Sequence, residues 1–211
     1  MNFYQSALIS LAVFTAIFYY HWNRFDQSID ESKFARFLAF GILTGIVYGF
    51  LFSYLYIFDF YSAFVIVFST LLLFPVIESG AILSIISGKH RKEKNLPILS
   101  TAIGGGMALP QIFFYSILLS TSFLDVLFSI SLSVTAIFSN MISSYLIGNG
   151  ISHGRMIIYY NASIITQFLV GFTLVSDYLF GRYSIFISIS LSAFSAIIYM
   201  LIFNRYNNEM E

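Results

Sequence analysis

The sequence predicts an all-α polytopic membrane protein in which seven transmembrane helices form a single domain over residues 1–211. Three observations predict this fold class. First, 58% of the residues are hydrophobic and only 9% are charged, whereas soluble proteins carry roughly 25% charged residues. Second, the apolar residues gather in seven long segments. Third, the basic residues gather in alternate connections between those segments.

Each apolar segment is long enough to cross a bilayer, because a helix of about 20 residues spans the ~30 Å hydrocarbon core. The first segment lacks the basic start and the small-residue cleavage site of a signal peptide, so we expect it to be a span. The predicted spans are, in order, Phe3–Tyr20, Phe37–Phe58, Ser62–Ser87, Ile98–Ser120, Leu124–Ile147, Met156–Val175 and Ser184–Phe203.

The distribution of charge predicts the orientation of the spans. With seven spans, nine of the ten Lys and Arg residues fall on the side of the C-terminus, and only Arg182 falls on the other. The positive-inside rule therefore places the N-terminus outside and the C-terminus in the cytoplasm. We expect 22–36, between the first two spans, to be a linker that lies along the headgroups. The nine residues are Arg24, Lys33, Arg36, Lys89, Arg91, Lys92, Lys94, Arg155 and Arg205.

The second and seventh spans carry a small residue at every fourth position. Such faces let two helix backbones approach closely and gain van der Waals contact. We favour packing inside the bundle over a subunit interface, since small-residue faces usually serve the fold. The small residues are Gly41, Gly45, Gly49 and Ser53 in the second span, and Ser184, Ser188, Ser192 and Ala196 in the seventh.

The third span contains Glu78, its only acidic or basic residue between Tyr61 and Gly88. A charged carboxylate inside a membrane costs at least ~2.5 kcal/mol, so Glu78 marks a functional or structural site that faces protein. Pro75 has no N–H group, and it therefore leaves the carbonyl of Leu71 without its helical partner. We expect this irregular backbone to face protein or water.

The fourth span combines Gly104, Gly105 and Gly106 with Pro110, which cannot donate to the Gly106 carbonyl. This arrangement predicts a kink beside three flexible residues. Gly104 and Ala108 also form a small-residue pair four positions apart.

The later spans contribute neutral polar residues. In the fifth span Asn140 is accompanied by serines and a threonine, and in the sixth Gln167 is expected to be an interhelical hydrogen-bonding residue. The glycosylation pattern Asn161-Ala-Ser163 falls inside the sixth span, so we interpret it as packing or a polar interhelical contact.

The third span with Glu78, the basic connection 88–95 and the glycine-rich fourth span together resemble the PrsW family of glutamate-dependent intramembrane proteases. The resemblance covers about residues 60–150, and it extends in topology to the seven-span scaffold subunit of γ-secretase. In the proteases, a Glu-Glu-x-x-Lys motif is followed by a glycine-rich span that ends in a Glu-Asn pair, and then by a histidine in the next span.

The resemblance implies Glu78, Gln111 and Asn140 as the candidate catalytic residues. Glu78 matches one glutamate of the first motif, but apolar residues fill the lysine position. Gln111 stands near the place of the second-motif glutamate, and the fifth span has no histidine. A carboxylate that activates water needs a second group to donate a proton or to stabilise the oxyanion. We therefore expect Glu78 to be structural.

Composition excludes several other kinds of function. The chain has no cysteine, so disulfides, thiolate catalysis and Cys-ligated metals are excluded. The net charge is zero, which gives no field that attracts nucleic acid. The three histidines, His21, His90 and His153, stand at predicted span ends or in connections, so we expect no metal site and no cofactor.

These observations predict a non-catalytic scaffold or assembly subunit in the cell membrane, with a membrane protein or a second copy of the chain as its partner. Two alternatives stay open. One is an intramembrane protease whose second catalytic group is not evident from the sequence. The other is a small transporter or channel that uses Glu78 as a proton or cation site.

Overall fold

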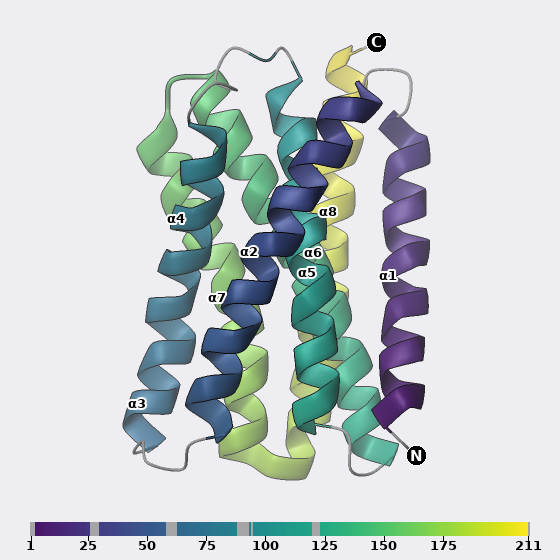
Figure 1. The fold of residues 1–211 in the computed structure, drawn as a ribbon, viewed down its shortest axis with the longest axis vertical. Coiled ribbons are helices and arrows are strands. Elements are labelled where there is room, and N and C mark those ends of the chain that lie inside the picture. Colours follow the sequence, from purple (N-terminus) through teal and green to yellow (C-terminus); the bar gives the residue numbers. More distant parts are fainter. Residues whose placement is uncertain are drawn as a thin grey trace.

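The computed structural model describes residues 3–25, 30–57, 63–87, 93, 95–119 and 123–210, and over these residues it is an all-helical bundle without strands (Figure 1). The third and fourth helices follow one another through a π-helical segment without a break, so seven rods stand side by side. The elements are α1 (Phe3–Phe25), α2 (Glu31–Ile57), α3 (Ala63–Phe68), η2 (Ser69–Leu73), α4 (Phe74–Ile86), α5 (Leu96–Leu119), α6 (Phe123–Ser152), α7 (Met156–Phe180), η3 (Gly181–Tyr183) and α8 (Ser184–Met210).

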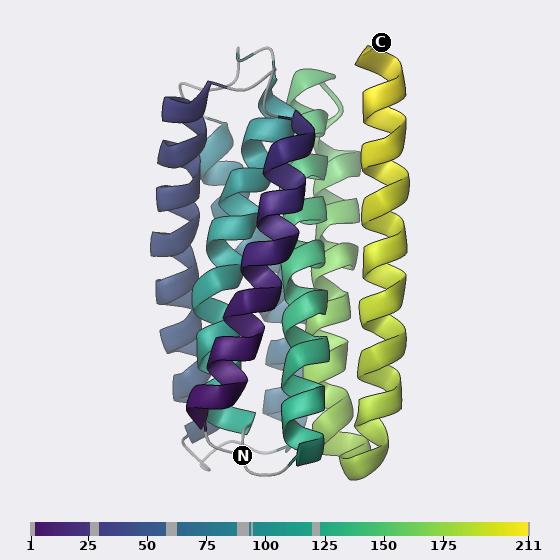
Figure 2. The same ribbon diagram turned by 90° about the vertical axis from the view of Figure 1, so that its right-hand side faces the viewer.

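The structure has the character of a multi-pass membrane protein. Among the described residues, six helical stretches are long and apolar enough to cross a membrane, and they correspond to α2, α3–α4, α5, α6, α7 and α8. The 23-residue α1 is not among these six. It packs against α5 and α6, and Figure 2 shows it running alongside them.

The chain crosses the length of the bundle with each rod, so the N-terminal end of α1 and the C-terminal end of α8 lie at opposite ends (Figure 1). Lys33 and Arg36 stand near the start of α2, and Arg155 directly precedes α7. Both helix starts lie at the end of the bundle where α8 finishes. The basic residues Lys89, Arg91, Lys92 and Lys94 lie outside the described residues.

The predicted headgroup linker over 22–36 was wrong at both of its ends, because α1 continues to Phe25 and α2 begins at Glu31. Asp30 caps α2: its Oδ1 accepts from the backbone N–H groups of Ser32 and Lys33 at 3.0 and 3.2 Å. The extended ends also pack together, since the rings of Trp22 and Phe34 lie edge to face with their centroids 4.5 Å apart. Capping and aromatic contact thus keep these residues helical.

The central helix of the bundle is α5. Its three consecutive glycines face three different helices. A Cβ added at Gly104 would lie 2.1 Å from an atom of α6, and one at Gly105 would lie 2.6 Å from an atom of α1. A Cβ at Gly106 would lie 2.3 Å from an atom of α2. The helix is continuous through Pro110. Tight contact on three sides therefore holds α5 in the middle of the bundle.

The glycine face of α2 lies against α5. A Cβ at Gly41 would lie 2.2 Å from the carbonyl oxygen of Ile103, and one at Gly45 would lie 2.5 Å from that of Met107. On α8, Ser184 and Ser188 are buried, whereas Ser192, one turn after Ser188, is only partly buried. The small-residue face of α2 is therefore a packing face inside the bundle.

Candidate functional site

The backbone before Glu78 is widened by the π-helical segment η2. The N–H of Phe74 donates to the carbonyl of Ser69, five residues back. Pro75, which has no N–H group, directly follows this turn. A Cβ at Gly171 of α7 would lie 2.4 Å from the Thr70 carbonyl oxygen. The irregular backbone is thus covered by protein, as the membrane requires.

Four side chains from four helices form a continuous hydrogen-bonded chain, which we call the amide chain: Glu78, Gln111, Asn140 and Gln167. Gln111 Nε2 donates to Glu78 Oε1, and Asn140 Nδ2 donates to Gln111 Oε1 at 2.8 Å. Gln167 Nε2 donates to Asn140 Oδ1 at 2.9 Å. All four side chains are at most 3% exposed. The amide chain therefore joins α4, α5, α6 and α7 in the interior of the bundle.

The amide chain has a direction. Each carboxamide donates through its NH₂ group toward Glu78, and the oxygens of Gln111 and Asn140 accept from the next residue of the amide chain. Asn140 also donates to the carbonyl of Ala136 at 2.9 Å, which fixes its orientation on α6. At the far end, Gln167 Oε1 has no hydrogen-bond partner among the described residues. Glu78 thus acts as the acceptor at one end, and an unpaired acceptor terminates the other.

A second polar chain runs beside the first and consists of hydroxyl groups. Ser163 Oγ lies 2.8 Å from Ser79 Oγ and 2.5 Å from Ser143 Oγ. These three serines connect α4, α7 and α6, and all are fully buried. Ser163 is therefore an interhelical contact. Asn161, the other polar residue of the glycosylation pattern, is exposed on the surface of α7.

His21 forms a separate buried polar cluster that the sequence did not point to. Its Nδ1 lies 2.5 Å from Tyr199 Oη and its Nε2 lies 2.8 Å from Thr101 Oγ1, so it links α1 to α8 and α5. The ring of Phe203 packs against it at right angles, with the centroids 5.2 Å apart. His21 lies one turn before the end of α1 at Phe25, and it is fully buried against α5 and α8.

The amide chain contains one titratable group, Glu78, and three neutral amides. The buried imidazole of His21 is far from it, because its partner Thr101 stands ten residues before Gln111 on α5, about 15 Å along the helix axis. Among the described residues, no group of three or more His, Cys, Asp or Glu side chains could hold a metal ion. The arrangement can bind a proton on Glu78 and cross-link helices, but it offers Glu78 no second acid or base.

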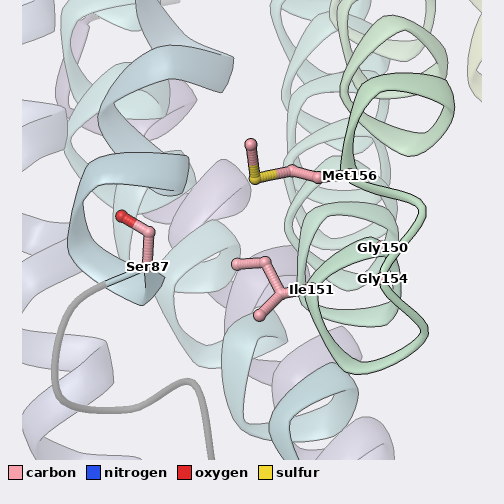
Figure 3. A pocket seen from close by; sticks show the side chains of 5 residues that line it. All are labelled: Ser87, Gly150, Ile151, Gly154 and Met156. Atoms are coloured by element: carbon pink, nitrogen blue, oxygen red, sulfur yellow. The ribbon is translucent and has the colours of Figure 1, made fainter.

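A pocket of about 180 Å³ lies elsewhere, between the end of α4 and the connection from α6 to α7. Figure 3 shows the side chains of Ile151 and Met156 directed across the opening toward Ser87, with Gly150 and Gly154 behind. Ser87 stands nine residues after Glu78, about 13 Å along α4. The described residues that line the pocket carry no charge, and none of them belongs to the amide chain.

Comparisons with models of known protein families, with curated proteins and with solved structures found no match. The similarity of residues 60–150 to the PrsW family accordingly stays a proposal.

Proposed function

We propose that the chain is a non-catalytic scaffold or assembly subunit of a membrane protein complex in the cell membrane, with a PrsW-type fold. The observation that carries the proposal is the amide chain, in which the carboxyl group of Glu78 accepts from Gln111 and begins a cross-link over four helices. Interhelical hydrogen bonds of this kind stabilise membrane bundles. The intramembrane acid then acts as a structural hydrogen-bonding group.

The proposal includes seven spans, with the N-terminus outside and the C-terminus in the cytoplasm. The 23 residues of α1 correspond to about 34 Å of helix, enough for the ~30 Å hydrocarbon core. Nine of the ten basic residues would then share the cytoplasmic side. Charge bias and helix length support the same arrangement.

A proton- or cation-conducting role is the second candidate, and the hydroxyl chain favours it. Ser79, directly after Glu78, begins the row of three serines that reaches α6. Hydroxyl groups both donate and accept, so such a row can pass a proton, whereas the amides of the amide chain are held in one direction. In this role Glu78 would be the group that takes up and releases the proton.

Substitution of Glu78 distinguishes a structural role from a chemical one. Glu78→Gln keeps an oxygen that accepts from Gln111, so it should leave folding and assembly of the complex intact. Glu78→Ala removes the acceptor and should lower stability by roughly 1–2 kcal/mol, the scale of one interhelical hydrogen bond in lipid. Glu93→Gln serves as the control, because Glu93 pairs with Lys33 outside the amide chain, with Oε2 and Nζ 2.7 Å apart.

The three variants should be purified from their own membrane in mild detergent and compared for the size of the complex, thermal stability, peptide cleavage and proton flux in liposomes. The scaffold role expects a defined complex that Glu78→Gln preserves and Glu78→Ala weakens. Loss of cleavage or proton flux in a folded Glu78→Gln protein, with Glu93→Gln unaffected, would reject it in favour of a protease or a transporter.

A further inference from the structure

Three buried polar atoms beside the amide chain have no hydrogen-bond partner among the described residues: Thr70 Oγ1, Ser139 Oγ and Gln167 Oε1. Their residues are 1%, 0% and 1% exposed. A buried hydroxyl or amide oxygen without a partner destabilises the folded state. Native structures therefore supply such groups with a partner, either from the protein or from ordered water.

The register of α6 against α7 brings Ser139 and Gln167 together. α6 and α7 are antiparallel, and their register is fixed by Ser143 with Ser163 at 2.5 Å and by Asn140 with Gln167 at 2.9 Å. Ser139 stands one turn before Ser143, and Gln167 stands one turn after Ser163, so the two face each other.

The third atom belongs to Thr70 in the π-helical segment η2, which packs against α7. The carbonyl of Thr70 lies against Gly171, one turn beyond Gln167. Thr70 therefore stands about one helical turn from Gln167 along α7.

The hydroxyl of Ser139 differs from those of Ser133 and Thr135, which precede it on α6. Ser133 Oγ donates to the carbonyl of Ser129 at 2.6 Å, and Thr135 Oγ1 donates to that of Ser131 at 3.0 Å. Bonding back to the preceding turn is the ordinary solution for a hydroxyl in a helix interior. Ser139 does not take this bond. Its hydroxyl is thus available to a group that is not part of its own helix.

Water fits the chemistry of the junction between η2, α6 and α7. Gln167 Oε1 needs a donor, and the two hydroxyls can each donate and accept, so one or two water molecules satisfy all three atoms with about three bonds each. A metal cation such as Ca²⁺ or Mg²⁺ requires about six oxygen ligands, while the neighbouring oxygens of Gln111 and Asn140 already accept hydrogen bonds. Irregular helical turns are also places where water enters the backbone ladder.

We propose that ordered water is bound at the junction of η2, α6 and α7, where it donates to Gln167 Oε1 and hydrogen-bonds with Ser139 and Thr70. The water completes the amide chain at the end opposite Glu78 and fixes the carboxamide of Gln167. It also places exchangeable protons in the interior of the bundle, four hydrogen bonds away from the carboxyl group of Glu78. This site does not depend on the proposed scaffold role.

Water-edited solid-state NMR of the uniformly ¹³C,¹⁵N-labelled full chain in lipid bilayers tests the proposal. Magnetisation from water should reach Ser139 Cβ and Gln167 Cδ at least twice as fast as it reaches Ser133 Cβ. Ser133 is the matched internal control, since it is on the same helix and equally buried but is paired with protein. Equal, slow transfer to Ser139 and Ser133 would overturn the proposal.

Two further measurements keep the test decisive. Ser139→Val should reduce the transfer to Gln167 toward the Ser133 rate, while Ser133→Ala should leave it unchanged. If the Ser139→Val protein does not fold, a density map of the unmodified chain at about 2 Å must show water within hydrogen-bond distance of Gln167 Oε1. Both measurements should be repeated with choline chloride in place of sodium chloride. Loss of the fast transfer or of the density without Na⁺ would assign the site to a cation and refute the proposal that it binds water.

Discussion

Replacing Gly104 by alanine should push α5 away from α6 at the amide chain. The added Cβ would lie 2.1 Å from the backbone oxygen of Asn140 and 2.6 Å from Ser144 Oγ. Ordinary contact begins at 3.4 Å, so the helices must separate by about 1.3 Å. The closest atom belongs to the backbone, and no rotation of a side chain can relieve the clash.

The expected cost has two parts. Overpacking of this kind typically costs about 1–3 kcal/mol. The same displacement would lengthen the bond from Asn140 Nδ2 to Gln111 Oε1, now 2.8 Å, beyond hydrogen-bond range, and an interhelical bond contributes about 0.6–1.7 kcal/mol. We expect Gly104→Ala to lower the free energy of unfolding by about 2–4 kcal/mol.

Gly80→Ala is the matched control, because it is the same substitution within a helix. There the added Cβ would lie 3.6 Å from Tyr160 Oη, which is ordinary contact. Alanine is favoured over glycine in a helix by up to about 1 kcal/mol, so this variant should be as stable as the parent or slightly more stable. Unfolding in detergent, followed by far-UV circular dichroism, measures both. Equal stability of the two variants would refute the close approach of α5 and α6.

Three further predictions concern other parts of the bundle. Gly45→Leu should be misfolded and poorly extracted in mild detergent, because the side chain would enter the backbone of α5; a folded and fully assembled variant would show that this face looks onto lipid. In this cysteine-free chain, Arg155→Cys should be protected from an impermeant reagent applied outside the cell and Tyr183→Cys should be labelled, and the reverse pattern would invert the proposed orientation. His21→Phe should lower thermal stability by about 1–3 kcal/mol, because two hydrogen-bonded partners on α5 and α8 lose their common group; an unchanged melting temperature would contradict the cluster.

The residues singled out from the sequence for the site come together in the structure. Glu78 is evident from one sequence because an acidic residue inside an apolar span must face protein. Gln111 and Asn140 are candidates through the resemblance to the PrsW family. The hydrogen bonds among the three side chains also require the relative rotation of three helices. That rotation depends on tertiary packing at the glycines of α5, which no local pattern specifies.

Two features of the structure could not be predicted from the sequence, and the reason can be identified for each. Pro75 indicated an irregular backbone, but not the π-helical turn before it, in which the Thr70 carbonyl lies against Gly171 of a distant helix. His21 resembled an interfacial residue because the apolar run of the first span ends just before it. Its burial follows from contacts with Tyr199, 178 positions away. Long-range contacts decided both outcomes.

The central position of α5 has a consequence for biogenesis. The membrane-spanning stretch of α5 is the least apolar of the six, and 89% of it is buried inside the bundle. A segment of this kind gains little by leaving the translocon for lipid alone, since its glycines offer few apolar groups to acyl chains. Its neighbours α1 and α2 are synthesised first, whereas α6 emerges only afterwards. We therefore expect α5 to be retained near the insertion machinery until α6 is made, and nascent chains truncated between α5 and α6 to be degraded preferentially.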